Sequence, residues 1–365
     1  MNVTSVKRIH QSDWTDYGIH FLRARDIVSA YKNEEPDDYL YISKEKYDEY
    51  SSISGKVSIG DMLVTGVGTI GVPYLVENSE PLYFKDGNII WFQNEDKVFG
   101  KFLFYSFAGK SIQDFITESA GIGTVGTYTI ESGKKTPISL PNKEEQERIG
   151  LFFANLDHLI TLHQRKYEKL HNIKKSMLEK MFPKNGSNVP EIRFKGFTEA
   201  WEQRKVQDVA DRFDNLRIPV AANLRVHGTT PYYGANGIQD YVEGFTHDGE
   251  FVLVAEDGAN DLKNYPVKCV NGRIWVNNHA HVLQGKAGIA NNSFLAFDIS
   301  QSDIESLLVG GGRAKLNAET LMSIEFRLPC LQEQFRIGKY LTQLDRLITL
   351  HQRKPNIYTG GYYAE

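Results

Sequence analysis

The sequence predicts an α+β protein in which two mixed domains are separated by long helices. Two observations support this prediction. First, residues 1–140 and 201–328 are rich in β-branched and aromatic residues punctuated by glycine, as expected of short strands between turns. Second, a segment that begins at residue 141 shows hydrophobic residues at helical spacing, and it returns near the C-terminus. At 365 residues the chain is long enough for two domains that each bury a core.

The repeat is the most informative feature of the chain. The matching blocks are 145–150 with 333–338, 156–166 with 344–354, and Leu140-Pro141 with Leu328-Pro329. All keep one register, 188 residues apart, which is a domain-sized period and too long for a solenoid repeat. The helical segments match closely, whereas the segments before them share pattern but little sequence. The duplication therefore predicts a common frame that carries two different domains.

In the first domain, short apolar runs between turn residues predict strands, and a longer run predicts a helix over 97–118. The predicted strands are 61–64, 72–76, 82–84, 88–92 and 127–130. Residues 142–182 then predict one amphipathic helix, because Ile149, Leu156 and His163 begin a series at seven-residue intervals. Such a helix would be about 60 Å long, and Pro183 would end it.

The second domain follows the same plan, with a shorter helix at its end. Its predicted strands are 251–254, 273–276 and 294–297. The second helix is expected to stop before Pro355, after about 25 residues or near 37 Å. The predicted boundaries are 1–140 for the first domain, 141–184 for its helix, 185–200 for a linker, 201–328 for the second domain, 329–354 for its helix and 355–365 for an atypical tail.

Composition limits the classes of protein and of site. A net charge of −4 excludes a globally basic nucleic-acid binder, so any DNA contact must come from local patches or from a basic partner. The absence of a signal peptide and of a long apolar run predicts a cytoplasmic protein without a membrane span. Cys269 and Cys330 lack metal or disulfide spacing, and we expect both to be packing residues.

Two Gly-x-Gly-x-x-Gly matches, 66–71 and 121–126, raise the possibility of a dinucleotide site. A helix should follow the glycines directly in such a site, because the pyrophosphate binds at its N-terminus. The residues after both matches predict strands instead, which argues against nucleotide binding. Tight hairpins, or a glycine loop that lets backbone approach a DNA phosphate, remain as alternatives.

No motif predicts catalysis or a metal site. The chain lacks the Asn-Pro-Pro-aromatic loop of adenine methylases, and Asp248 with Asp261 and Lys263 is a loose nuclease match that we interpret as a solvated loop. His279 and His281 lie on one side of a predicted strand with no carboxylate or thiol placed to complete a metal site, so packing or a hydrogen-bonded pair is expected. His163 and His351 occupy equivalent helical positions, which favours a structural role in helix pairing.

Basic and polar residues beside aromatics are the more useful signal for DNA. Arginine and lysine can pair with guanine edges and asparagine with adenine, while hydroxyls and backbone amides bind phosphates. The first-domain candidates are Lys7, Arg8, Arg23, Arg25, Thr124, Tyr128 and Thr129. The second-domain candidates are Tyr232, Tyr233, Asn236, Arg313, Lys315 and Asn317. For each of them an ordinary surface role is the alternative.

Taken together, these residues resemble the specificity subunits of type I restriction-modification systems over nearly the whole chain. The resemblance rests on the helix starts that both copies share, Leu-Pro, Glu-Gln, Arg-Ile and Leu-Asp-x-Leu-Ile. It also rests on Met181-Phe182-Pro183-Lys184, on the segment from Phe194 to Lys205, and on the segments 60–64 and 232–237.

The resemblance implies that the two mixed domains are target-recognition domains, each reading one half of a split, asymmetric site in double-stranded DNA. It implies that the two helices form an antiparallel coiled coil on which two modification subunits dock, with restriction subunits joining the full complex. The chain itself would be non-catalytic and would hold no cofactor. S-adenosylmethionine, ATP and Mg²⁺ would be used by the partner subunits.

The sequence departs from the family at two places. No counterpart of Trp201 to Lys205 precedes Asn2, and the second helix is shorter than the first. We therefore expect an incomplete first domain and an incomplete coiled coil. The alternatives are a truncated or silent specificity allele that binds partner subunits without productive DNA recognition, and an enzyme, either a lone nuclease or a methylase.

Overall fold

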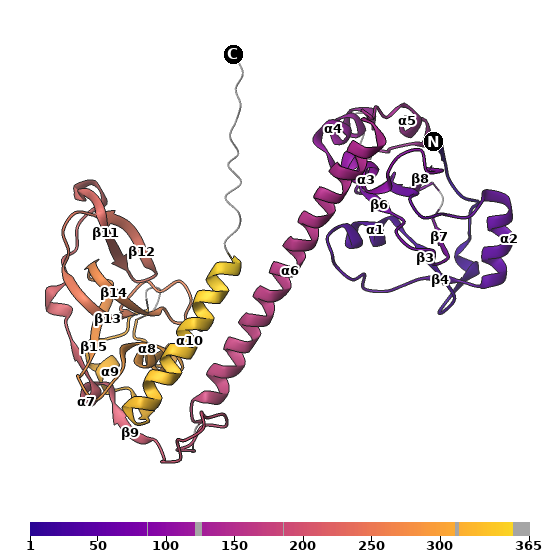
Figure 1. Cartoon of the computed structure of the whole chain (residues 1–365). Coiled ribbons are helices and arrows are strands. Elements are labelled where there is room, and N and C mark those ends of the chain that lie inside the picture. The colour runs from indigo at the N-terminus through magenta and orange to yellow at the C-terminus, as the bar shows by residue number, and fades with distance from the viewer. Residues whose placement is uncertain (86, 121–125, 185, 311–313, 353–365) are drawn as a thin grey trace. The chain divides into compact units, whose positions relative to one another are not determined.

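The computed structural model describes residues 1–85, 87–120, 126–184, 186–310 and 314–352. The chain divides into two compact units, Met1–Thr161 (unit 1) and Leu162–Glu365 (unit 2). The boundary falls within the long helix α6 (Lys143–Met181), which the sequence predicts to within one residue at each end and which continues from one unit into the other (Figure 1). Within the described ranges, no helix is long and apolar enough to cross a membrane.

Unit 1 contains two four-stranded sheets. The first has the antiparallel order β1-β8-β5-β6, with β1 (Asn2–Thr4), β8 (Ile89–Gln93), β5 (Met62–Thr65) and β6 (Pro73–Leu75). The second has the order β2-β4-β3-β7, with β2 (Trp14–Thr15), β4 (Tyr41–Ile42), β3 (Ile19–Leu22) and β7 (Leu82–Phe84), and only β3 and β7 are parallel. The helices are α1 (Ala24–Tyr31), α2 (Lys44–Ser54), α3 (Gly100–Ala108), α4 (Lys110–Ser119) and α5 (Ile130–Lys135).

Strand β8 lies between the two hydrophobic cores of unit 1. Successive strand residues point to opposite faces, so Trp91 packs in one core and Phe92 in the other. The indole N–H of Trp91 donates to the buried Asp61 carboxylate at 2.9 Å, which satisfies its polar atom inside the core. The first sheet is therefore buried on both faces.

Four of the five strands predicted for this domain are confirmed, and one is wrong. Residues 127–130 do not form a strand, because Thr129 caps α5 by accepting the Ser132 N–H at 3.2 Å. The predicted helix over 97–118 is two helices that break at Gly109. Residues 66–71 form the tight connection from β5 to β6, with positive φ at Gly68 and Gly71, which agrees with the hairpin interpretation.

Unit 2 is built on one six-stranded sheet of order β10-β15-β13-β14-β11-β12. Its strands are β10 (Ala210–Arg212), β11 (His227–Gly234), β12 (Gly237–Val242), β13 (His247–Ala255), β14 (Val267–Val276) and β15 (Ala280–Gly285). Only β11 and β14 pair in parallel. A separate ribbon joins β9 (Glu202–Lys205) to β16 (Glu325–Leu328), and short helices α7 (Val206–Val209) and α9 (Ala318–Ser323) complete the domain.

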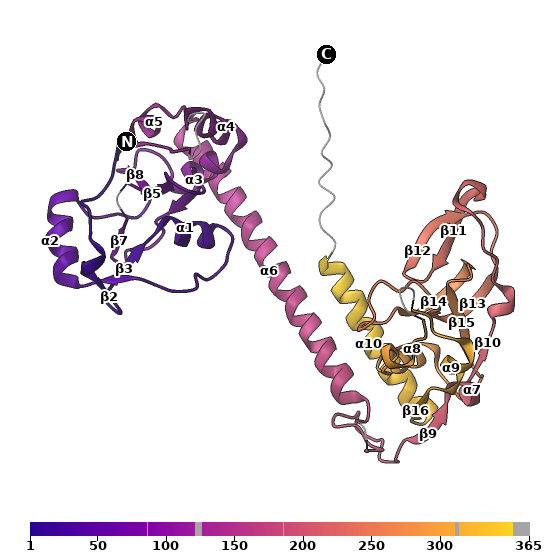
Figure 2. The same ribbon diagram turned by 180° about the vertical axis from the view of Figure 1, so that it is seen from behind.

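Helix α8 (Asn292–Ser300) lies between this sheet and α10 (Leu331–Gln352) (Figure 2). The prediction of a strand at 294–297 is therefore wrong, whereas those at 251–254 and 273–276 are confirmed within β13 and β14. Helix α8 is buried on nearly all sides, so its run Phe294-Leu295-Ala296-Phe297 is apolar without helical periodicity. Asn291 begins the helix by accepting the Phe294 N–H at 3.0 Å.

Within unit 2, the C-terminal half of α6 runs antiparallel to α10. His163 contacts His351 with their Nδ1 atoms 2.9 Å apart, and further along Lys174 pairs with Asp345 at 2.5 Å. Leu170, Ile173, Met177 and Leu178 of α6 pack against the same core as Ile337, Leu341 and Leu344 of α10. The predicted α+β fold, with two mixed domains and an antiparallel pair of helices, is confirmed.

Candidate nucleic-acid interface

Each mixed domain is fixed to its helix by an equivalent glutamine. Buried Gln146 donates to the Pro141 carbonyl at 2.8 Å and accepts the Phe99 N–H at 3.0 Å. Buried Gln334 donates to the Pro329 carbonyl at 2.9 Å and accepts the Asn291 N–H at 2.9 Å. Phe99 and Asn291 are the residues that begin α3 and α8. The repeated Glu-Gln sequence thus docks a corresponding helix in both domains.

An equivalent glycine lets the two helices approach closely in each copy. A Cβ atom at Gly150 would lie 2.7 Å from the backbone N of Phe102, and one at Gly338 would lie 2.9 Å from that of Phe294. Any larger residue would push the domain away from its helix. The repeated blocks therefore specify how each domain is mounted, and the surfaces that differ lie on the domains themselves.

In unit 1, two candidate arginines share one acidic partner. Arg23 donates to both carboxylate oxygens of buried Asp26, at 2.9 and 2.8 Å, and also binds Asp38. The hydrogen bond to Asp26 is the main cause that raises the pKa of Arg23. Arg25 also pairs with Asp38, but its guanidinium lies at the surface. Arg23 therefore has a structural role at the start of α1, whereas Arg25 presents a charge to solvent.

Lys7 and Arg8 are exposed on a neighbouring segment. The Lys7 ammonium lies 4.6 Å from the centre of the Tyr50 ring on α2, and its carbonyl accepts the Tyr83 hydroxyl at 2.8 Å. A cation held over an aromatic face keeps a defined position while it stays accessible. These two residues and Arg25 are the candidate cations of unit 1 that a phosphate could reach.

The other candidates of unit 1 are placed differently. Tyr128 is buried, its hydroxyl is 2.5 Å from that of Thr136, and burial raises its pKa to about 12. Its side chain is thus not available at the surface. Thr129 is exposed and serves as the cap of α5. Thr124 lies outside the described residues, as do 121–125 as a whole.

In unit 2, Tyr232 and Tyr233 are also core residues. The Tyr232 hydroxyl accepts the Val220 N–H at 3.0 Å, and the Arg225 guanidinium lies 4.1 Å from its ring centre. Tyr233 packs in the core on the other face of the sheet. Their place beside polar residues predicts a DNA contact, but their alternation along β11 buries them on opposite faces.

Asn236 and Lys315 are brought together by the segment 256–260. Asn236, at the turn between β11 and β12, donates to the Gly258 carbonyl at 2.9 Å and accepts the Asn260 N–H at 2.9 Å. The Lys315 ammonium lies 2.8 Å from the Glu256 carboxylate, and its backbone bridges Asp257. A hollow of about 170 Å³ lies beside Asn236. Exposed Asn317 precedes α9 nearby in sequence, and Arg313 lies outside the described residues.

A buried charge network supports Lys315, and the sequence analysis missed it. Glu256 also binds Arg217 at 2.6 Å, and Asp214 lies 2.7 Å from Nδ1 of buried His281. Burial alone would raise the pKa of Glu256, but Lys315 and Arg217 lower it overall. Burial alone would also raise the pKa of Asp214, but His281 and the Val282 N–H lower that pKa overall.

Carboxylates do lie beside the two histidines, so the expectation that none is placed there is wrong. Atoms of Asp214, Glu256 and His281 lie within 4.8 Å of one another and could hold a metal ion. Arg217 and Lys315 already neutralise the two carboxylates, however, and an ion would have to displace them. His279 lies 2.5 Å from Asp257. Sequence spacing gave no signal for this group because its members come from four separate segments.

Three further predictions concern single residues. Asp261 accepts the N–H groups of Lys263 and Asn264 at 3.0 and 2.9 Å, which is a local turn of the solvated-loop kind. Cys269 is packed, and burial raises its pKa to about 12. Cys330 is exposed, so its assignment as a packing residue is wrong.

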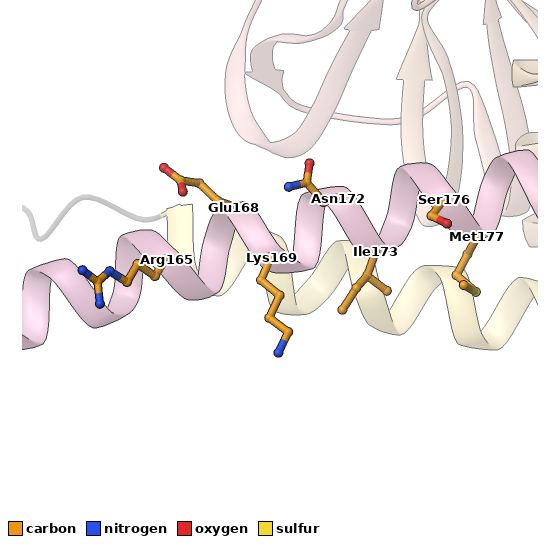
Figure 3. Close-up of a pocket in the computed structure, with 7 residues that line it drawn as sticks. All are labelled: Arg165, Glu168, Lys169, Asn172, Ile173, Ser176 and Met177. Carbon is orange, nitrogen blue, oxygen red and sulfur yellow. The ribbon is translucent and has the colours of Figure 1, made fainter. Parts of the chain in front are cut away.

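A hollow of about 540 Å³ lies along α6 in unit 2. Figure 3 shows that its lining residues all come from successive turns of this one helix. Among them are Arg165, Glu168 and Lys169, which carry charges of both signs. Pockets that enclose a small ligand are usually apolar and formed by several elements, so this hollow is a feature of the helix surface.

A single family model, the type I restriction modification DNA specificity domain, matches the chain twice, over residues 7–172 and 198–357. The chain belongs to this family. Each match spans one mixed domain and the helix segment that carries the docking glutamine, so the internal repeat is a repeat of the specificity domain.

Named relatives agree with this assignment. A putative type I restriction enzyme specificity subunit from Haemophilus influenzae is 46% identical over 146 residues, which is 40% of this chain and 38% of that relative. The MjaVIII specificity subunit of Methanocaldococcus jannaschii is 23% identical over 69% of this chain and 65% of its own length. The chain thus matches less than two thirds of the length of either relative.

The fold has a counterpart among solved structures. The S subunit of a type I restriction-modification system from M. genitalium superimposes with a TM-score of 0.62, covering 96% of this chain and 88% of that one. The sequence identity is 13%, so the similarity concerns the fold.

Proposed function

We propose that this chain is the DNA sequence-specificity subunit of a type I restriction-modification complex and acts in the cytoplasm. Each mixed domain reads one half of a bipartite, asymmetric site in double-stranded DNA. The helices set the spacing between the halves and dock two modification subunits, and restriction subunits complete the assembly. The chain contributes recognition, while methylation and cleavage, with S-adenosylmethionine, ATP and Mg²⁺, belong to the partners.

The observation that carries the proposal is the double match of one specificity domain to two domains with different surfaces. The mounting is the same in both copies, but the accessible cations differ. Unit 1 presents Lys7, Arg8 and Arg25, and unit 2 presents Lys315 beside Asn236. Two unlike readers on one frame favour a target with two unlike halves. The net charge of −4 is consistent with partners that supply much of the phosphate neutralisation.

The experiment is adenine-methylation mapping in cells that express the chain with a matching modification subunit. We expect a split, asymmetric motif. Exchange of residues 1–140 for those of another specificity subunit should change one half of the motif and leave the other intact. A continuous motif, or a change in both halves, would contradict the two-reader model.

Point variants test which surface of each unit binds DNA. Arg25→Ala should weaken DNA binding through unit 1, and Lys315→Ala through unit 2, each with a smaller salt dependence because phosphate contacts are lost. Lys110→Ala is the matched control, since Lys110 is a highly exposed cation on α4 with only a local partner, Asp114. An equal loss of binding in all three variants would show a nonspecific charge effect.

A further inference from the structure

Unit 2 differs from unit 1 in the connection between two of its strands. The strand order β15-β13-β14 of unit 2 corresponds to β8-β5-β6 of unit 1, and the third strand pairs antiparallel with the second in both. Residues 66–72 join β5 to β6, whereas the longer run 256–266 joins β13 to β14. The loop 256–266 is therefore a place where the two domains are built differently on a common arrangement of strands.

The loop 256–266 lies at the same edge of its domain as the connection in unit 1. The Leu316 N–H donates to the Glu256 carbonyl at 2.7 Å. In unit 1 the N–H of the repeat equivalent, Tyr128, donates to the Gly66 carbonyl at 2.9 Å. Each donor lies two residues before a short helix, α9 in unit 2 and α5 in unit 1. The frame thus places both connections beside the same segment, which in unit 2 carries Lys315.

A side-chain clamp from the β11–β12 turn holds the loop. The Asn236 amide donates to the Gly258 carbonyl and its oxygen accepts the Asn260 N–H, both at 2.9 Å. Pairing of an asparagine with an adenine edge needs a donor and an acceptor of the same amide. Since the loop already uses one of each, Asn236 has the geometry of a support for residues 258–260.

Charged groups hold the base of the loop. Asp257 lies 2.5 Å from His279, and Glu256 binds both Lys315 and Arg217, at 2.8 and 2.6 Å. The free energy cost of burying charged groups offsets much of what their pairing contributes, so such a network adds little to stability. It does fix geometry, because each group has a defined partner. The network therefore indicates that the position of the loop matters for what the domain does.

The tip of the loop presents two exposed side chains, Asn260 and Lys263. Among the residues that the structure describes, neither the Asn260 amide nor the Lys263 ammonium has a hydrogen-bond or ion-pair partner. Their main-chain N–H groups are nevertheless fixed, by Asn236 at 2.9 Å and by Asp261 at 3.0 Å. A free amide on a fixed backbone suits bidentate pairing with an adenine edge, and a free ammonium suits a phosphate.

We propose that the loop 256–266 reads the half-site of unit 2, with Asn260 paired to an adenine in the major groove and Lys263 bound to a neighbouring phosphate. Asn236 is a positioning residue that acts through the loop. This inference rests on the proposed function and names the residues that carry it out in unit 2. The connection 66–72 has no asparagine or lysine, so unit 1 reads its half-site with different groups.

The test is adenine-methylation mapping of the complex that the chain forms with a matching modification subunit. Asn260→Ala should keep a split motif with the same gap and relax one A·T position in one half, where discrimination falls by about tenfold or more. The other half stays unchanged, which shows that the variant folds and assembles. Asn271→Ala is the matched control, because Asn271 is also an exposed asparagine of unit 2 but lies within β14. It should leave the whole motif unchanged.

Two further variants separate base reading from support and from phosphate binding. Asn236→Ala should relax the same position as Asn260→Ala and increase hydrogen exchange at 258–260, because the loop loses its clamp. A mere loss of stability in this variant would weaken recognition of all positions of the half-site equally. Lys263→Ala should weaken binding to every sequence alike, lower its salt dependence and leave the motif as it is.

The possible results distinguish this inference from the proposed function. If the wild-type complex methylates no split motif, the proposed function fails and the inference with it. If the motif is split but Asn260→Ala leaves it unchanged, or the Asn271→Ala control relaxes it equally, the inference alone is overturned. Relaxation at different positions in Asn236→Ala and Asn260→Ala would overturn the positioning role of Asn236, and a changed motif in Lys263→Ala would overturn the assignment of Lys263 to a phosphate.

Discussion

Asp298 is a buried carboxylic acid in α8, and the described residues offer no hydrogen-bond partner to its Oδ2. Burial raises its pKa well above the ordinary value. The contribution of the Asp298 carboxyl to the free energy of unfolding is then fully present below its unfolded pKa, near 4. It is lost as the pH rises towards the folded pKa. Asp298→Asn should raise stability at pH 7 by about 1 kcal/mol or more, with little effect at pH 4. Thermal unfolding between these pH values measures the difference, and a lower melting temperature at pH 7 would contradict it.

Arg23 and Arg25 of unit 1 are expected to have different roles, one structural and one in DNA binding. Arg23→Ala leaves the buried Asp26 with only a 3.9 Å contact to Arg25 and should cost on the order of 3 kcal/mol. Arg25→Ala removes a surface charge and should change stability by less than about 1 kcal/mol while it weakens DNA binding. Denaturant unfolding and a DNA titration of both variants measure the two effects. An unstable Arg25→Ala protein would show that this side chain is structural too.

For single residues, the sequence predicts which residue types are candidates for DNA contact, but it does not predict whether each has a structural or a binding role. Arg23 and Arg25 give the same signal in the sequence and both contact Asp26 and Asp38, but only the fold shows that the Arg23 side chain is largely buried and the Arg25 side chain is exposed. Tyr232 and Tyr233 follow one another in sequence, but Tyr232 stacks on Trp275 whereas Tyr233 joins the core around Phe251. Partners that are distant in the sequence decide these roles, and the spacing of residues along the chain does not reveal those partners.

The docking of α10 depends on Gln334, which binds the Pro329 and Ile289 carbonyls and the Asn291 N–H. Gln334→Ala leaves three buried backbone groups without this partner and should cost about 2–3 kcal/mol. Chemical denaturation of unit 2 measures the loss. Gln332→Ala is the control, because Gln332 is exposed on the same turn. Equal stability of the two variants would refute this role of the glutamine.

The histidine pair at the end of the helix contact predicts a pH response. The pKa of His351 is lowered, first by burial and then by the charges of Lys166 and His163. Because the pKa of His351 is lowered, the contribution of its contact to the free energy of unfolding is present above the unfolded pKa, near 6.5. It is lost as the pH falls below that value. Amide exchange of residues 345–352 should therefore accelerate from pH 7.5 to pH 5.5 beyond its intrinsic change. His351→Gln should abolish that acceleration, and if it persists the histidine pair is not its cause.

Part of the fold follows from the sequence, and the errors have identifiable causes. Apolar runs between turn residues predict β5, β6, β7, β8, β13 and β14, and seven-residue spacing predicts α6, whereas the short strands β1 to β4 have no predicted counterpart. The missed helix α8 has no polar face, so its pattern carries no period. The repeat contained the needed information, since equivalent glutamines bind the start of α3 and the start of α8, and α3 lies within the helix predicted at 97–118.

The length of α6 is predicted to determine the spacing of the two half-sites. Seven residues inserted after Ala154 add about 10 Å and keep the seven-residue pattern in register. The gap in the methylated motif should then grow by about three base pairs, because duplex DNA rises about 3.4 Å per pair. Methylation mapping reads the gap directly. Substitution of seven exposed residues without insertion is the control, and an unchanged gap would show that α6 is not the spacer.

At the scale of the whole molecule, the duplication predicts two domains that are each followed by a helix. The segments that do not match between the copies predict where the two domains differ. The matched blocks identify the frame without any knowledge of the domains. Sequence alone does not reveal that Leu344 and Ile348 are buried while their repeat equivalents Leu156 and Ile160 are exposed, because burial depends on partners far along the chain.

The docking glutamines bind only main-chain groups: the carbonyls of Pro141, Pro329 and Ile289 and the amides of Phe99 and Asn291. Main-chain groups are the same whatever side chains a domain carries. A domain can therefore diverge, or be replaced by an unrelated one through genetic recombination, without loss of its attachment. If the chain has the proposed function, exchange of a whole domain would change the DNA sequence that is read, while the frame that holds the domain stays the same.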